Sequence, residues 1–156
     1  MKVSGGQVQP VSLGTRLDTG QEMSQENVEV VRRSTTAYNR RDLDRMLEEW
    51  APDAVLDWSR ARSFDAGVYR GHGEIRAFVE GFLAVWDEVR FEIVDGPVEV
   101  GEGLLITENV AYLRGRDGIE VQARSAWLTT IRDGKQTSLT LYQTKQEAVQ
   151  AAGLRG

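Results

Sequence analysis

The sequence has no cysteine and a single histidine, His72, among its 156 residues. Without thiols the chain forms neither a disulfide bond nor a thiolate metal site. One imidazole is too few for a histidine-rich zinc or iron centre, and a serine-histidine-aspartate triad would have to use His72. We therefore expect no metal and no cofactor.

An excess of positive charge and long apolar runs are also missing. Asp and Glu number 24 against 19 Lys and Arg, which gives a net charge of −5 and a pI near 5.0. Phosphate binding needs a basic face, so nucleic acid is not an expected partner. No apolar run approaches the roughly 20 residues of a membrane span, and no charged-then-apolar signal peptide opens the chain. These observations favour a soluble cytoplasmic protein that makes no membrane contact.

The length and composition predict one globular domain with a sizeable core, because 40% of the residues are hydrophobic and 28% are charged. Residues 1–22 lack hydrophobic periodicity and are rich in Gly, Gln, Ser and Thr. We interpret residues 1–22 as an N-terminal extension and residues 23–156 as the domain. The extension is either a leader or an arm that packs on a partner subunit.

Two Asp-Gly dipeptides predict the architecture of the second half. Asp117-Gly118 and Asp133-Gly134 each separate two alternating apolar runs. Asp-Gly allows both central residues of a tight turn to take positive φ, as a right-twisted hairpin requires. We therefore predict a meander of antiparallel strands over residues 90–100, 104–116, 119–132 and 135–143, with a kink in the first strand at residues 95–97.

The capping residues and apolar periodicity of the first half of the sequence predict helices. Ser24 is a good N-cap for a first helix that ends at residues 39–41, and Asp42 caps a short second helix that Pro52 stops. A strand over residues 54–59 and a glycine-containing loop follow. The third helix has a strongly periodic apolar stripe: Ile75, Phe78, Phe82, Val85, Trp86 and Val89. A terminal helix over residues 145–152 closes the chain. A long curved sheet preceded by helices forms a cone, and a cone encloses a pocket.

Several sequence segments together resemble one known group of proteins. They read YNRRDLDRM, APDAV, DWSR, YRGHGEIRAF, IRDGK and EAVQAAGL. The chain is similar over about residues 23–154 to the SnoaL-like polyketide cyclase group of the nuclear transport factor 2-like, or ketosteroid isomerase-like, superfamily. The resemblance implies an α+β fold, a cone-shaped α+β barrel whose curved antiparallel sheet wraps around N-terminal helices. It also implies a small-molecule pocket and a homodimer formed through the sheet.

The fold does not fix the chemistry, because this superfamily includes isomerases, epoxide hydrolases, dehydratases, cyclases and non-catalytic binders. The epoxide hydrolases activate water with an arginine and two aspartates. By resemblance, those positions hold Asn109, Ala111 and Leu141 in this chain. The epoxide hydrolase mechanism is therefore not expected.

The isomerase and cyclase chemistries both depend on a single carboxylate. By resemblance, the isomerase tyrosine matches Ser34, the catalytic base matches Trp58, and the second aspartate falls near Trp127 or Leu128. Asp57 adjoins the base position, and a bulge of one residue would bring it there. A cyclase needs a carboxylic acid in the pocket, and Asp57 is again the leading candidate.

The matched strands also predict which side chains face the pocket, because strand side chains alternate between the two faces. The inward set is small and largely apolar: Thr107, Asn109, Ala111, Leu113, Ala123, Ser125, Trp127, Thr129, Leu139, Leu141 and Gln143. The outer set mixes aromatic, aliphatic and charged groups: Glu108, Val110, Tyr112, Arg114, Gln122, Arg124, Ala126, Leu128, Ser138, Thr140 and Tyr142. Such a mixed outer face suits a dimer interface.

We predict Asp57 and His72 as catalytic residues. A carboxyl group beside Trp58 in an apolar cup would have a raised pKa, and His72 could move protons near neutral pH. The alternatives are a strand-end carboxylate paired with Arg60 or Arg62, and a surface or capping histidine. The predicted ligand-binding residues are Tyr38, Trp58, Asn109, Trp127 and Trp86. Each of these could instead be a core residue or be satisfied by an ordered water molecule.

The sequence leaves two functions open. In the first, the protein binds a small, largely apolar molecule deep in the cone, and an enzymatic form would be cofactor-free proton transfer of isomerase, cyclase or hydratase type. In the second, it is a non-catalytic ligand-binding or scaffold dimer. Asp57 facing inward beside a polar partner would favour catalysis, whereas a pocket lined by Trp, Leu and Thr would favour binding.

Overall fold

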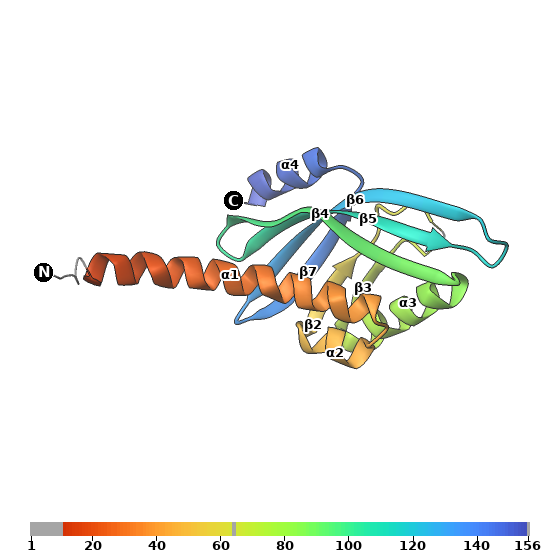
Figure 1. Ribbon diagram of the computed structural model, residues 1–156, viewed down its shortest axis with the longest axis horizontal. Coiled ribbons are helices and arrows are strands. Elements are labelled where there is room, and N and C mark those ends of the chain that lie inside the picture. The colour runs from red at the N-terminus through yellow and green to blue at the C-terminus, as the bar shows by residue number, and fades with distance from the viewer. Residues whose placement is uncertain (1–10, 64, 156) are drawn as a thin grey trace, which may run out of the picture.

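The computed structural model describes the backbone of residues 11–63 and 65–155, and the side chains of residues 22–63 and 65–153. Figure 1 shows a curved sheet with the N-terminal helices on one side and the C-terminal helix on the other. The elements are α1 (Val11–Asn39), α2 (Leu43–Glu48), β2 (Trp50–Asp57), β3 (Val68–Arg70), α3 (Gly71–Val85), β4 (Glu88–Gly101), β5 (Leu104–Arg114), β6 (Glu120–Arg132), β7 (Lys135–Tyr142) and α4 (Lys145–Arg155).

The strands form one six-stranded sheet in the order β3-β2-β7-β6-β5-β4. The sheet curves around the helices without closing on itself, which confirms the predicted α+β cone. One pair departs from the antiparallel prediction, since β2 runs parallel to β7. This pair joins the helical half of the chain to the meander, and the long connection between its two strands permits either direction.

Both Asp-Gly hairpins are present, but their turns differ. Asp133 and Gly134 take φ of 54° and 77°, as a tight hairpin turn requires. At the other hairpin only Gly118 has positive φ, at 85°. There, Gly115 donates its backbone N–H to the Ile119 carbonyl at 2.9 Å, so the loop is longer than the predicted two residues. The predicted kink in β4 is confirmed, because its register to β5 shifts on both sides of Asp95.

The first helix begins at Val11, and the prediction of a start at Ser24 is wrong. No proline lies between these two residues, and lengthening an existing helix by one residue is far easier than nucleating a new one. Figure 1 shows the first part of α1 projecting beyond the sheet. The part of the predicted extension before Val11 lies outside the described residues, and its role remains a prediction.

The segment between α2 and α3 contains more strand than was predicted. Asp42 caps α2 by accepting a hydrogen bond from the Arg45 backbone N–H at 3.1 Å, as expected. Strand β2 then starts at Trp50 and contains Pro52, rather than starting at residue 54. The predicted loop contains the short strand β3, in which Val68 pairs with Asp57. A strand of three residues is too short to show a readable alternation.

Helix α3 ends earlier than its predicted stripe. Ile75 and Val79 are buried in the core, but Val85 closes the helix and is 46% exposed. Val89 belongs to β4, where it is buried. When a strand with a buried residue directly follows an apolar helix, the apolar spacing of the helix continues into the strand. The predicted helix stripe therefore extended to Val89, beyond the true end of α3.

The outer face of the sheet is partly covered, and the dimer through this face stays a prediction. Small side chains of α4 pack on this face and form a second apolar cluster: Ile106, Ala126, Leu128, Tyr142, Ala148 and Ala152. The end of the outer face nearer the β5–β6 hairpin stays open. Tyr112 and Arg124 lie there, and Arg124 pairs with Glu108 at 3.2 Å.

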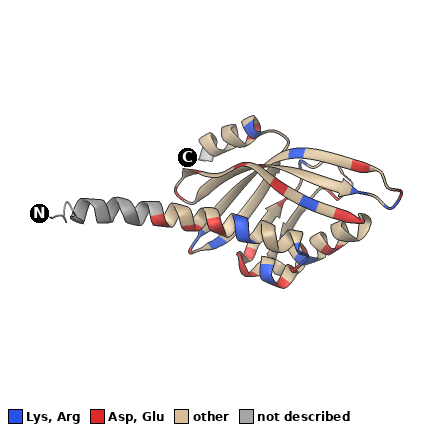
Figure 2. Ribbon diagram, viewed as in Figure 1, with Lys and Arg blue, Asp and Glu red and all other residues tan. Residues whose placement is uncertain are grey.

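Figure 2 shows acidic and basic residues interspersed along the described helices and strands, without a large area of one sign. Most ion pairs of the described residues lie on the surface, where each contributes little to stability. The described helices contain no apolar stretch long enough to span a bilayer.

Candidate functional site

The inside of the cone contains a small, mostly apolar cavity of about 60 Å³. Helices α1, α2 and α3 form one side, and β2, β4, β6 and β7 form the other. Aromatic rings dominate the walls: Tyr38, Trp50, Trp58, Phe78, Phe82, Phe91 and Trp127. We call this space the inner cavity. Its walls combine apolar bulk with a few polar atoms, as small-molecule sites usually do.

A larger depression of about 490 Å³ adjoins the inner cavity, and we call it the outer groove. The two spaces share Trp58, Phe82 and Phe91 in their walls. The predicted inward faces of the strands supply much of the groove: Ala111, Leu113, Ala123, Ser125, Leu141 and Gln143. The predicted inward direction of these side chains is therefore confirmed.

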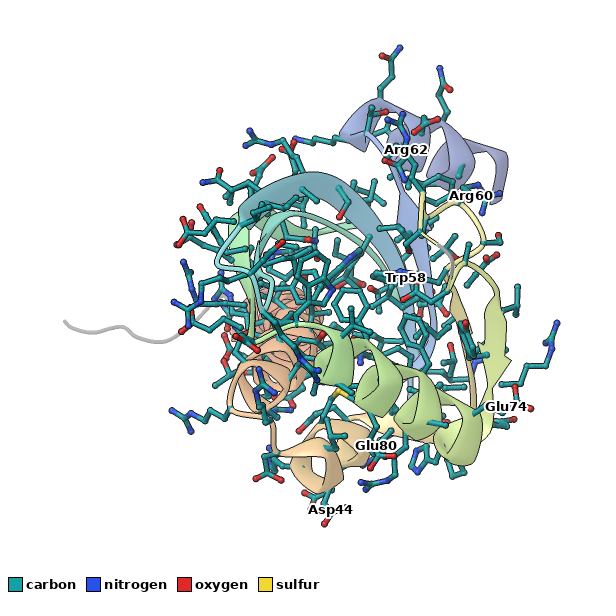
Figure 3. All side chains as sticks on the ribbon, turned by 90° about the vertical axis from the view of Figure 1, so that its right-hand side faces the viewer. Asp44, Trp58, Arg60, Arg62, Glu74 and Glu80 are labelled. Atoms are coloured by element: carbon teal, nitrogen blue, oxygen red, sulfur yellow. The ribbon has the colours of Figure 1, made fainter. Side chains whose placement is uncertain are left out.

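Trp58 lies at the junction of the two spaces. Figure 3, which looks at the end of the cone nearer the β5–β6 hairpin, shows this side chain in the middle of the molecule, with Arg60 and Arg62 above it. Its ring centroid is 5.6 Å from that of Phe78 on α3. The backbone N–H of Trp58 donates to the Gly67 carbonyl at 2.7 Å. This bond fixes the end of β2 and places the indole between sheet and helix.

The described walls of the inner cavity contain no charged side chain. Burial raises the pKa of Tyr38 above its ordinary value of 10.0, with a smaller lowering by Arg41 and a smaller raising by Asp65. The phenol therefore stays protonated at neutral pH and can donate a hydrogen bond. Its ring packs edge-on against Phe91 at 5.1 Å.

Hydrogen bonds to Ser34 organise the polar end of this cavity. The Ser34 hydroxyl accepts from Trp50 Nε1 at 3.1 Å and from Gln136 Nε2 at 3.3 Å. All three residues line the cavity. Because the Ser34 oxygen is already engaged by two donors, it holds the Trp50 ring in place.

Asp57 lies outside the walls of both spaces. Its carboxylate accepts from the Ser59 backbone N–H at 3.0 Å and from the Ser59 hydroxyl at 2.5 Å. Arg60 approaches the other carboxylate oxygen at 3.6 Å. The position therefore matches the alternative that we described, a strand-end carboxylate beside Arg60. The catalytic role of Asp57 stays a prediction.

His72, the second predicted catalytic residue, lies at the start of α3. Its Nε2 atom is 2.9 Å from the Trp50 carbonyl oxygen, and the ring is half-buried. It is absent from the walls of the inner cavity and the outer groove. The contact ties the N-terminus of α3 to the first residue of β2, and the structure does not bring His72 and Asp57 together at either space.

The predicted ligand-binding residues divide between the two spaces and the core. Tyr38 and Trp127 line the inner cavity, and Trp86 lines the outer groove. Trp58 lines both. Asn109 is fully buried on the inward face of β5, where its Oδ1 accepts from the Ser125 hydroxyl at 3.3 Å. Its amide nitrogen has no partner among the described residues.

Sequence reasoning did not single out Gln136, although this residue is buried and lines the inner cavity. Alternation along the last strand would place Gln136 on the outer face. The β6–β7 register shifts, so that Ser138 pairs with Thr130 and Gln136 pairs with Ile131. This bulge reverses the alternation and turns Gln136 inward. No feature of the sequence marks the bulge.

A metal site is not formed by the described residues, because no three His, Cys, Asp or Glu side chains cluster suitably. Three charged residues line the outer groove: Arg62 and Asp65 on the segment between β2 and β3, and Arg124 on β6.

The model of the SnoaL-like domain matches residues 31–139 of the chain. This protein belongs to the SnoaL-like family. The match covers every element from the end of α1 to the middle of β7, which includes all walls of the inner cavity. A search of curated proteins finds no match.

Solved structures share the fold of this SnoaL-like protein at low identity. An NTF2-like protein of unknown function from Burkholderia pseudomallei is 21% identical, with a TM-score of 0.67 over 80% of this chain and 95% of the other. A putative polyketide cyclase from Xanthomonas campestris is 18% identical, with a TM-score of 0.61 over 80% and 94%. A Mycobacterium tuberculosis protein in complex with estradiol-17β-hemisuccinate is 14% identical, with a TM-score of 0.67 over 78% and 95%. These similarities concern the fold.

Proposed function

We propose that this SnoaL-like protein binds a small, largely apolar molecule in the inner cavity and the outer groove. One observation carries the proposal: an uncharged, aromatic cavity adjoins a mostly apolar groove of about 490 Å³, and three aromatic residues form walls of both. A groove of this size falls in the range of small-molecule sites, about 300–1,000 Å³. The Mycobacterium tuberculosis protein of the same fold was solved in complex with estradiol-17β-hemisuccinate.

Binding is favoured over catalysis by the nature of the walls. Proton transfer requires an acid or base within hydrogen-bond reach of the bound molecule. The inner cavity offers neutral Tyr38, Ser34 and Gln136, whereas Asp57 contacts Ser59 and Arg60. An isomerase-, cyclase- or hydratase-type reaction therefore remains the second candidate. The carboxylate that favours it is Asp65, which lines the outer groove.

We also propose that the protein forms a homodimer through the open part of the outer sheet face. Arg90 stacks on Tyr112 at 4.3 Å, and Arg124 pairs with Glu108 at 3.2 Å on this surface. Helix α4 restricts the interface to the end nearer the β5–β6 hairpin. Sedimentation of the wild type and of Tyr112→Glu tests this: a monomer at micromolar concentration in the wild type contradicts the proposal.

The binding proposal is tested with naphthyl methyl ketone as a probe and titration calorimetry as the readout. Trp58→Ala removes the ring that both spaces share and is expected to weaken binding at least tenfold, since a buried aromatic side chain contributes about 2 kcal/mol of contact. Val149→Ala, which removes an exposed apolar side chain on α4 outside both spaces, is the control. Equal affinities of the two variants, or no binding by the wild type, would refute the proposed site.

A further inference from the structure

Asp65 is a half-buried carboxylate in the wall of the outer groove. It lies on the segment between β2 and β3, and among residues 22–63 and 65–153 no basic side chain forms an ion pair with it. A charge that is partly removed from water is costly unless an opposite charge faces it. A positively charged group on a ligand would supply the partner that the described chain does not.

Two hydrogen bonds hold Asp65 beside the groove. Tyr69 on β3 donates its hydroxyl to the Asp65 backbone carbonyl at 2.5 Å, and the Ser63 hydroxyl donates to the Asp65 carboxylate. The Tyr69 ring in turn packs on Phe78 of α3, with ring centroids 4.4 Å apart. The carboxylate is therefore held in position before a ligand arrives, and binding does not have to pay for ordering it.

The negative charge of Asp65 acts on the interior of the cone. Burial is the main cause of the raised pKa of Tyr38 in the inner cavity; Arg41 lowers this pKa, and the Asp65 carboxylate raises it. Burial followed by the Asp65 carboxylate also raises the pKa of Tyr69. A carboxylate that disfavours a second negative charge on these phenols stabilises a positive charge bound near it.

The two basic residues of the outer groove oppose a bound cation only weakly. Arg62 is exposed, and Figure 3 shows it above Trp58. Arg124 already pairs with Glu108 at 3.2 Å, and its side chain is 63% exposed. Water and salt screen charges in such positions. Asp65 is the most buried of the three charged residues, so the electrostatics of the groove favour a cation.

Aromatic rings make up much of the rest of the groove. Four of its residues are aromatic: Trp58, Phe82, Trp86 and Phe91. The face of an aromatic ring attracts a cation, and groups of such rings recognise ammonium ions that carry alkyl groups on the nitrogen. A primary ammonium has three donors that need acceptors, which a mostly apolar groove does not offer. The walls therefore favour an alkylated ammonium over a primary one.

The two spaces differ in where they can accept a charge. The inner cavity, at about 60 Å³, has no charged side chain among its described walls, so a cation there would be buried without a counter-charge. The outer groove, at about 490 Å³, includes Asp65 and has room for an ammonium group with an attached ring. The charged end of a ligand therefore belongs in the outer groove.

We propose that the ligand is a largely apolar molecule that carries an alkylated ammonium group, and that Asp65 and the aromatic rings of the outer groove receive this group. The inference rests on the proposed function, because it specifies the chemical class of the ligand of that same site. It assigns Asp65 to charge recognition and involves no covalent step.

Three probes of similar shape test this inference by equilibrium dialysis. The naphthylmethyl trimethylammonium ion carries the positive charge, neopentylnaphthalene replaces its nitrogen with carbon, and naphthylacetate carries a negative charge instead. We expect wild-type protein to bind the ammonium ion about tenfold more tightly than the neutral hydrocarbon. Naphthylacetate is expected to bind more weakly than the ammonium ion.

Variants locate the preference within the protein. Asp65→Asn can still accept the Ser63 hydroxyl, and it is expected to reduce the preference for the ammonium ion to less than threefold while leaving the affinity for the hydrocarbon unchanged. Trp86→Leu is expected to reduce the preference in part, and it serves if Asp65→Asn fails to fold. The matched control is Asp53→Asn. Asp53 is exposed on β2 and lines neither space, so this control changes the net charge equally but keeps the full preference.

The outcomes separate the two proposals. If the wild type binds the ammonium ion and the hydrocarbon equally, the inference fails while the proposed function stands. If naphthylacetate binds most tightly, Arg62 and not Asp65 sets the charge preference, and the inference is overturned. An equal loss of preference in Asp65→Asn and Asp53→Asn would also overturn it, since net charge would then be the cause. If none of the three probes binds, the proposed function fails together with the inference.

Discussion

Glu49 provides the sharpest test of how the helices are held against the sheet. The residue lies between α2 and β2 and is 6% exposed. Arg33 on α1 donates to it from Nε at 3.1 Å and from a terminal nitrogen at 3.3 Å. Arg45 on α2 donates at 2.5 Å. One buried carboxylate thus joins α1 to α2, two helices that form walls of the inner cavity.

The pKa of Glu49 reflects two opposing causes. Burial raises it, but the hydrogen bonds from Arg33 and Arg45 outweigh burial, and the pKa lies below the ordinary value of 4.5. A carboxyl group whose folded-state pKa is lowered stabilises the protein above its unfolded-state pKa. This contribution is lost as the pH falls through the folded-state pKa. The effect is therefore complete at pH 7 and disappears in acid.

Replacing Glu49 with Gln is expected to lower the free energy of unfolding by about 2 kcal/mol at pH 7. Hydrogen bonds to charged groups contribute about 1.5–3 kcal/mol each, but the side chains of Arg33 and Arg45 are 38% and 40% exposed, so solvent screens the pairs. For a domain of this size, such a change corresponds to a fall of roughly 4–8 °C in Tm. Urea unfolding at pH 7 and in acid measures the difference directly.

Glu48 is the matched control for this measurement. It is adjacent in sequence and contacts Arg45 at 3.5 Å, but its side chain is 66% exposed. Glu48→Gln is expected to change stability by less than about 0.5 kcal/mol. If Glu49→Gln unfolds at the same urea concentration as Glu48→Gln at pH 7, the proposed link between α1 and α2 is refuted. A difference that persists undiminished below the folded-state pKa would refute the linkage argument.

Three further outcomes are expected. Because the pKa of Tyr38 is raised by burial, the wild type is expected to lose stability as the pH rises above the unfolded-state value of about 10, and thermal unfolding of Tyr38→Phe should lack this part of the loss. Asp57→Asn is expected to leave probe affinity within twofold in calorimetry, because Asp57 lies outside both spaces; a large loss would instead support its predicted catalytic role. His72→Ala removes the contact with the Trp50 carbonyl and is expected to destabilise the fold by about 1 kcal/mol in urea unfolding.

Local patterns in the sequence predicted most of the fold. Strands that alternate on either side of Asp-Gly, and a helix capped by Asp42, depend on residues close together in the chain. The errors arose where a partner far away in sequence decides the structure. Strand β3 forms because it pairs with β2, and Val89 becomes part of β4 because β5 lies beside it.

The candidate site shows the same division. Trp127 could be placed inside the cone because the family resemblance indicates which strand faces point inward and side chains alternate along a strand, and Trp58 was placed there by its match to the isomerase base position. The inward orientation of the Gln136 side chain could not be predicted, because a bulge in the pairing of β6 and β7 causes it. Nor could the sequence decide whether Asp57 faces the cavity or Arg60, since that depends on the path of the segment between β2 and β3.

The sequence by itself determined the class of the protein: the absence of cysteine, the single His72 and the paired Asp-Gly turns limit the chemistry and specify a curved meander. Only the tertiary structure decided where the polar groups of the interior lie. Side-chain periodicity assigns a residue to a face, but hydrogen bonding depends on distances between strands and helices that are far apart in the chain. That packing leaves Asn109 Nδ2 and Trp127 Nε1 buried without a hydrogen-bond partner among the described residues.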